Sequence, residues 1–122
     1  MKTIAIYGDS ISTGTHGEGG YENTLKNSLS LDKVYNFAVG SSGLTRKTPG
    51  GMLEVLDKNP VPEDAELFLI WHGSNDWYWG SELEAFSEAI EAAVNRLRAA
   101  VPTACLVWVT PIYRFECSDG MA

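Results

Sequence analysis

Residues 3–10 read TIAIYGDS, and this stretch decides the fold. Its first five residues form a short apolar run rich in β-branched side chains, which is typical of a buried strand in a parallel sheet. The Gly-Asp-Ser that follows places a hydroxyl just beyond the carboxyl end of this strand. Because open α/β sheets bind their ligands at that edge, the stretch predicts a strand over residues 3–7 and makes Ser10 a candidate functional residue.

Three later stretches are also predicted to be strands, because they are short, apolar and flanked by turn-forming residues. They span residues 33–38, 67–71 and 104–109. The last is continuously apolar, as a central strand of a parallel sheet usually is. It is also the final strand pattern, so we expect an exposed apolar sheet edge at Val107 and its neighbours.

Helical patterns separate these strands. Residues 21–29 carry apolar side chains at four-residue spacing, and Thr48-Pro49 is expected to open a short helix with proline at its first position. Residues 81–84, SELE, form a capping-box sequence that is expected to open the longest helix, whose apolar face starts at Leu83 and which Pro102 ends. The alternation predicts one α/β domain over residues 1–122, a three-layer α/β/α arrangement around a parallel sheet.

The overall composition excludes several classes of protein. The 122 residues are 44% hydrophobic and 20% charged, with a formal net charge of −7. Phosphate binding requires clustered Lys and Arg, so this acidic chain is not expected to bind nucleic acid. No apolar run approaches the ~20 residues of a membrane span, and no signal peptide precedes the first strand. We therefore expect a cytoplasmic protein.

Cysteine and histidine spacing predicts no metal site, and no cofactor is expected. Cys105 lies in an apolar strand pattern and is expected to be a reduced, buried thiol, with Cys117 incidental. His16 and His72 are far apart, and no pair of metal ligands flanks either of them.

Two other segments follow predicted strands in the same way as Ser10. They are residues 36–40, NFAVG, and residues 73–76, GSND. Right-handed crossovers bring the carboxyl ends of all parallel strands to one edge, so Ser10, Gly40 and Asn75 are expected to converge there. Ester hydrolysis by a serine needs a nucleophile, a base and donors for the developing oxyanion. Ser10 supplies a hydroxyl and a backbone N–H, Gly40 an unshielded N–H, and Asn75 a side-chain amide.

These three segments together resemble the SGNH/GDSL hydrolases, a family of serine esterases. The resemblance covers most of the chain and implies a flavodoxin-like topology, with Ser10 as the nucleophile and with Ser10, Gly40 and Asn75 forming the oxyanion hole. The family's catalytic His and Asp come from an Asp-x-x-His block after a fifth strand, and this sequence has no such block. Asp119 has the spacing, but Ala122 stands where the histidine would be.

The missing block leads to the expectation of a domain shortened at its C-terminus. A second chain, or a second copy of this one, is expected to cover the exposed sheet edge. His16 and His72 are weak substitutes for the base, because one lies in a glycine-rich loop and the other beside Asn75 at a strand end.

Aromatic residues surround the Asn75 segment. We expect Trp71 to belong to the core and Trp77 to pack beneath the loop, leaving Tyr78 and Trp79 to contact a short-chain ester or an acetylated sugar. Asp9 and His72 are further candidates for substrate contact. Asp9 is also expected to orient its loop as a hydrogen-bond acceptor, and Asp76 is expected to be structural.

Two alternatives remain. Residues 10–15, SISTGT, also resemble the hydroxyl-rich phosphate loop of flavodoxins, which would make the chain an FMN-binding protein. In that case Gly8-Asp9 and the GSND segment have no role. The other alternative is an inactive SGNH-like binding module that keeps the pocket without the base.

Overall fold

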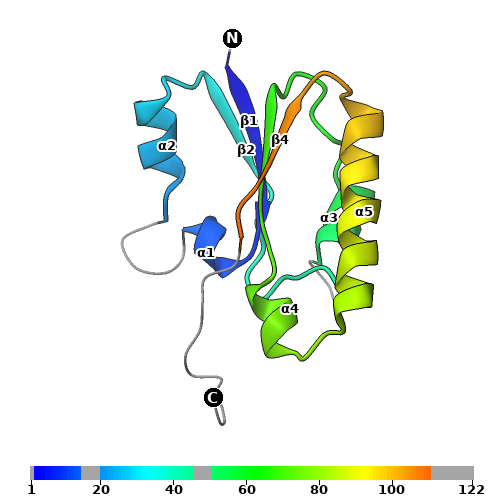
Figure 1. Ribbon diagram of the computed structural model, residues 1–122. Helices are drawn as coiled ribbons and strands as arrows, with labels where there is room; N and C mark the ends of the chain where they lie inside the picture. The colour runs from blue at the N-terminus through cyan, green and yellow to red at the C-terminus, as the bar shows by residue number, and fades with distance from the viewer. Residues whose placement is uncertain (1, 15–19, 46–50, 111–122) are drawn as a thin grey trace.

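A four-stranded parallel sheet forms the centre of the protein (Figure 1). The computed structural model describes residues 2–14, 20–45 and 51–110. The strands β1 (Thr3–Gly8), β2 (Lys33–Asn36), β3 (Leu67–Trp71) and β4 (Cys105–Trp108) lie in the order β2-β1-β3-β4. The four predicted strands are therefore confirmed, with ends that differ by one or two residues.

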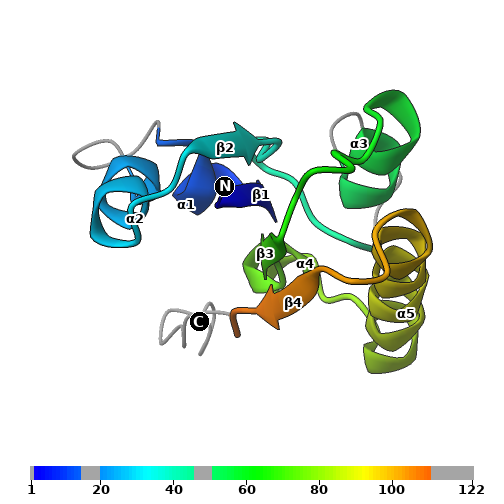
Figure 2. The ribbon, with the colours of Figure 1, turned by 90° about the horizontal axis from the view of Figure 1, so that it is seen from above.

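Helices cover both faces of the sheet, which confirms the three-layer α/β/α prediction. Seen from above, α2 (Glu22–Ser28) lies on one side, while α3 (Met52–Lys58) and α5 (Leu83–Ala100) lie on the other (Figure 2). Two short helices, α1 (Ser10–Thr13) and α4 (Ser74–Tyr78), follow β1 and β3 at the carboxyl edge of the sheet (Figure 1). These two helices were not predicted, because four or five residues are too few to show a helical period.

The two faces of the sheet bury very different amounts of apolar side chain. The larger core lies between the sheet and α3 and α5, and its fully buried members include Phe68, Ile70, Met52 and Leu97. The smaller core, on the α2 side, is built on Ile4, Ile6 and Leu31. Helix α2 itself buries no residue completely. Leu29, expected on its apolar face, is 46% exposed and does not belong to this core.

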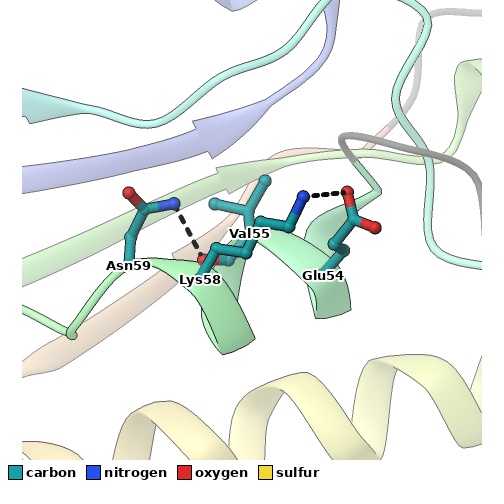
Figure 3. A network of polar contacts seen from close by, with 4 residues as sticks. All are labelled: Glu54, Val55, Lys58 and Asn59. Carbon is teal, nitrogen blue, oxygen red and sulfur yellow. Dashed lines mark hydrogen bonds and ion pairs between the residues drawn. The ribbon is translucent and has the colours of Figure 1, made fainter.

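Helix α3 begins at Met52 with Gly51 as its N-cap residue, so Pro49 does not occupy the first helical position. Thr48 and Pro49 themselves lie outside the described residues. At the other end, the Asn59 side chain and backbone N–H both donate to the Val55 carbonyl, and Lys58 pairs with Glu54 on the surface (Figure 3). These contacts end the helix before the connection to β3.

The predicted capping box of α5 is wrong. The N-cap residue is Glu82, without a side-chain cap bond. The Ser81 hydroxyl is instead hydrogen-bonded to the Thr45 hydroxyl, and the Ser81 N–H donates to the Asp76 carbonyl. Leu83, expected on the buried face, is 80% exposed. The helix ends at Ala100, two residues before Pro102, as predicted.

Strand β4 is an edge strand rather than a central one, because among the described strands it pairs with β3 alone. Val107 is 41% exposed, and Cys105 is a free, exposed cysteine rather than a buried thiol. Cys117 lies outside the described residues. In the part of the chain that the structure describes, no helix is both long and apolar enough to cross a membrane.

Candidate active site

Asp9 sets the conformation of the segment that carries Ser10. It is the N-cap residue of α1, and its carboxylate accepts a 3.0 Å hydrogen bond from the Ile11 N–H, as the sequence predicted. Its side chain is buried, and this burial raises the pKa of the Asp9 carboxyl. Ser10 is therefore the first residue of a helix, where backbone N–H groups have no acceptor within the helix itself. Its side chain is half-buried at the carboxyl edge of the sheet.

Close packing against β1 holds α1 in place. A Cβ at Gly8 would lie 2.6 Å from Ser12 Oγ and 3.1 Å from the Trp71 carbonyl oxygen, so only glycine lets α1 turn back this tightly. The Ser12 hydroxyl is 2.7 Å from the Tyr21 hydroxyl. On the other side, Asn36 Nδ2 donates to the Ser12 carbonyl at 2.9 Å and to Glu22 at 2.8 Å.

Gly40 follows a continuation of the β1–β2 ladder. Ile6 is level with Asn36, and beyond the strand the Val39 N–H donates to the Gly8 carbonyl at 3.0 Å. Gly40 therefore follows directly on the last residue that bonds to the end of β1, and Ser10 begins α1 two residues after that same end. A turn then closes with a hydrogen bond from the Ser42 N–H to the Val39 carbonyl. A Cβ at Gly40 would meet nothing within 4 Å, so open space surrounds this position.

Asn75 lies on α4, which begins directly after β3. The turn into α4 passes through Gly73 at φ 130°, a conformation that favours glycine. Asn75 Nδ2 donates a 2.8 Å hydrogen bond to the Ser42 carbonyl, two residues after Gly40. The structure thus connects the Asn75 segment directly to the Gly40 segment.

Asp76 is buried beneath the same segment. Its carboxylate accepts hydrogen bonds from the Leu44 N–H, the Thr45 N–H and the Thr45 hydroxyl, with shortest distances of 2.9, 2.7 and 2.7 Å. Asp76 therefore has the structural role expected from the sequence, because its carboxylate holds the backbone of Leu44 and Thr45.

His72 is buried at the end of β3, with only 1% of its surface exposed. Burial lowers the pKa of its imidazole to about 4, although the nearby Asp76 carboxylate acts in the opposite direction. Among the residues that the structure describes, Nδ1 finds no hydrogen-bond partner. The ring is consequently neutral at pH 7. His16, the other histidine, lies outside the described residues, as do Asp119 and Ala122.

The aromatic residues near Asn75 differ in exposure. Tyr78 is 69% exposed and Trp77 is 47% exposed, so the expectation that Trp77 packs beneath the loop is wrong. Trp71 packs against Tyr21, with ring centroids 5.7 Å apart. Trp79 is half-buried and lies against Gly43, where a Cβ would be 2.7 Å from its ring. Gly43 was not singled out from the sequence, because a glycine between a serine and a leucine has the same local signal as any loop glycine.

The fold and this edge define a class: an α/β domain with a serine, a glycine backbone amide and an asparagine amide following three neighbouring strands. A family model for the GDSL-like lipase/acylhydrolase family matches residues 6–121, so the chain belongs to this family. A search of curated proteins finds no match.

Solved structures share the fold. A protein from Lactobacillus plantarum has a TM-score of 0.77 and 19% identity over 91% of this chain, which covers 56% of that protein. A family two carbohydrate esterase from Clostridium thermocellum, solved with cellohexaose, has a TM-score of 0.69 and 18% identity, with 93% of this chain and 45% of that one covered. A carbohydrate acetylesterase family member from Sinorhizobium meliloti has a TM-score of 0.68 and 20% identity, with 91% of this chain and 63% of that one covered. The chain thus spans about half the length of these proteins.

Proposed function

We propose that this chain carries the nucleophile and the oxyanion hole of a serine esterase that acts on a short-chain ester or an acetylated sugar. The observation that carries the proposal is the hydrogen bond from Asn75 Nδ2 to the Ser42 carbonyl, because it ties two of the three predicted site segments together at the sheet edge where Ser10 lies. Ser10 would attack the ester carbonyl. Its own N–H, the Gly40 N–H and the Asn75 amide would stabilise the oxyanion.

The Asn75 amide can fulfil this role while it keeps its structural bond. A primary amide carries two N–H donors, and the bond to the Ser42 carbonyl uses one of them. That bond fixes the plane of the amide and leaves the second N–H for a substrate oxygen. Mutating an oxyanion donor typically lowers kcat about 10²- to 10³-fold.

The substrate class rests on the aromatic residues beside Asn75. Tyr78 and the half-buried Trp79 offer flat apolar surfaces against which a sugar ring or a short acyl chain can lie. Solved structures with this fold include a carbohydrate esterase and a carbohydrate acetylesterase family member, which is compatible with an acetylated sugar. Asp9 and His72 are too buried to offer much contact surface to a substrate. We therefore assign them a structural role at the site rather than a role in substrate binding.

We propose that the general base comes from outside the described residues. His72, the histidine that the structure describes, is buried and neutral, and a base with a pKa of about 4 takes up a proton poorly at pH 7. An Asp-x-x-His block supplied by another polypeptide segment, or His16, would complete the site. A second chain that carries the block, or a second copy that supplies His16, docked along β4 is the arrangement that the exposed edge favours.

The experiment is hydrolysis of p-nitrophenyl acetate by this chain, by Ser10→Ala and by the control Ser87→Ala, whose exposed serine lies on α5 away from the site. We expect Ser10→Ala to abolish turnover and Ser87→Ala to retain it. Equal and measurable rates for all three proteins would refute Ser10 as the nucleophile.

The same preparations distinguish the alternatives. The family match favours an esterase over an FMN-binding protein. A yellow protein with flavin absorbance would reverse that preference. A chain that binds an acetylated sugar but gives no Ser10-dependent turnover would be the inactive binding module.

A further inference from the structure

Asp76 and Asn75, adjacent on α4, both hold the segment that follows Gly40. The Asp76 carboxylate accepts two backbone N–H groups and one hydroxyl from Leu44 and Thr45. Asn75 donates to the carbonyl of Ser42. These contacts join residues more than thirty positions apart, and they hold residues 42–45, which lie two to five positions after Gly40.

Packing reinforces the hydrogen bonds. A Cβ at Gly43 would lie 2.7 Å from the Trp79 ring and 2.9 Å from Asp76 Oδ2, so the backbone there is pressed against both side chains. The Gly43 carbonyl accepts a 3.1 Å hydrogen bond from the Met52 N–H, which connects the segment to the start of α3. Gly40 is thereby held on its C-terminal side by contacts that do not include Gly40 itself, while on its N-terminal side the Val39 N–H is bonded to the Gly8 carbonyl.

We propose that Asp76 is a positioning residue, whose carboxylate holds the Gly40 turn at a fixed distance and orientation relative to the Asn75 amide. The part of this inference that concerns catalysis rests on the proposed function, in which Gly40 and Asn75 supply oxyanion donors. Donors stabilise an oxyanion only when they already point at it before the reaction, so placement errors of about 0.5 Å matter.

A carboxylate at position 76 fits this positioning role better than an amide of the same shape does. It presents two acceptor oxygens and no donor, which matches the three donors that face it. Asparagine has nearly the same shape, but its NH2 group would face a backbone N–H in place of an acceptor. Asp76→Asn therefore changes the hydrogen bonding of the Gly40–Thr45 segment with little change in volume.

The first readout does not depend on activity. Backbone and side-chain amide NMR, with hydrogen exchange, is compared for the unmodified chain, Asp76→Asn and the control Asp64→Asn. Asp64 is exposed, precedes β3 at the opposite edge of the sheet, and bonds to the Tyr35 hydroxyl. We expect Asp76→Asn to accelerate exchange at Leu44 and Thr45 at least about tenfold and to shift the Gly40 and Asn75 amide signals, with β1 and β3 unchanged.

Two outcomes of this comparison would overturn the proposal. One is Asp76→Asn signals for Gly40 and Asn75 that coincide with those of the unmodified chain. The other is an equal acceleration of exchange throughout the sheet, which would make Asp76 a general stabilising residue. Should Asp76→Asn fail to fold, Thr45→Val is the substitute, because it removes one of the same hydrogen bonds and keeps the side-chain shape.

Kinetics then separates this proposal from the proposed function. If Ser10-dependent hydrolysis is present, Asp76→Asn is expected to lower kcat at least about tenfold with KM changed less than about twofold. A larger change in KM than in kcat would contradict positioning. Absence of hydrolysis in every protein would refute activity of this chain by itself, while the NMR comparison still decides whether Asp76 sets the geometry of Gly40 and Asn75.

Discussion

The buried imidazole of His72 makes the stability of the fold depend on pH. Its pKa lies at about 4 in the folded protein, against 6.5 for an unperturbed histidine. Between these two values the unfolded chain binds a proton that the folded chain does not, so acidification favours unfolding. The shift of about 2.5 units corresponds to about 3 kcal/mol, at about 1.4 kcal/mol per unit. This contribution is fully present above pH 6.5 and is lost as the pH falls towards 4.

The measurement is urea unfolding followed by tryptophan fluorescence at about pH 4.5 and about pH 7.5, with linear extrapolation to water. The comparison protein is His72→Leu, which has a similar volume, does not titrate and removes the unpartnered Nδ1. Asp9 acts in the opposite sense, because burial raises its pKa and acidification relieves a buried charge. Asp9 is present in both proteins, so its effect cancels in the comparison.

When the pH falls from about 7.5 to about 4.5, we expect the free energy of unfolding to decrease by about 2–3 kcal/mol less in His72→Leu than in the unmodified chain. Parallel loss of stability in the two proteins would refute the argument, since it would mean that the imidazole is accessible to protons in the folded state. A loss greater in His72→Leu would mean that the folded protein stabilises the protonated ring, through Asp76, more than burial destabilises it.

Two further substitutions test how α1 is held. Gly8→Ala places a Cβ 2.6 Å from Ser12 Oγ, and we expect it to cost about 1–3 kcal/mol in urea unfolding and to lower any Ser10-dependent turnover; a variant as stable as the unmodified chain would show that α1 can move away freely. Asn36→Ala removes three hydrogen bonds of the side-chain amide: it leaves the Ser12 carbonyl and Glu22 without this donor and the Ala38 N–H without this acceptor. We expect a loss of about 1–3 kcal/mol, and no change in the unfolding midpoint would contradict it.

The strands and the site segments could be predicted because their signals are local. A buried parallel strand is a short apolar run, and the residue after it lies at the carboxyl edge whatever the details of packing. This reasoning placed Ser10, Gly40 and Asn75 after β1, β2 and β3, where they lie two, four and four residues beyond the strand ends; their catalytic roles stay predictions.

Other features could not be predicted, because they depend on contacts between distant segments. Ser81 and Glu84 fit a capping box, yet the Ser81 hydroxyl is hydrogen-bonded to the hydroxyl of Thr45, thirty-six residues away. Trp77 is exposed because α4 forms and turns it outward, and so short a helix leaves no periodic pattern. Gly43 is needed because Trp79 and Asp76 pack against it, and neither is near it in the sequence.

The unequal cores divide the candidate active site into two halves with different resistance to local unfolding. Ser10 lies on α1, whose contacts through Ser12, Tyr21 and Glu22 lead to α2 and the thin core. Gly40 and Asn75 instead lead through Asp76 and Met52 to the large core under α3 and α5. Local opening begins where the fewest apolar groups are buried. Ser10, the proposed nucleophile, is therefore carried by the part of the fold that we expect to open most readily, and Gly40 and Asn75, the proposed oxyanion donors, by the part that we expect to open last.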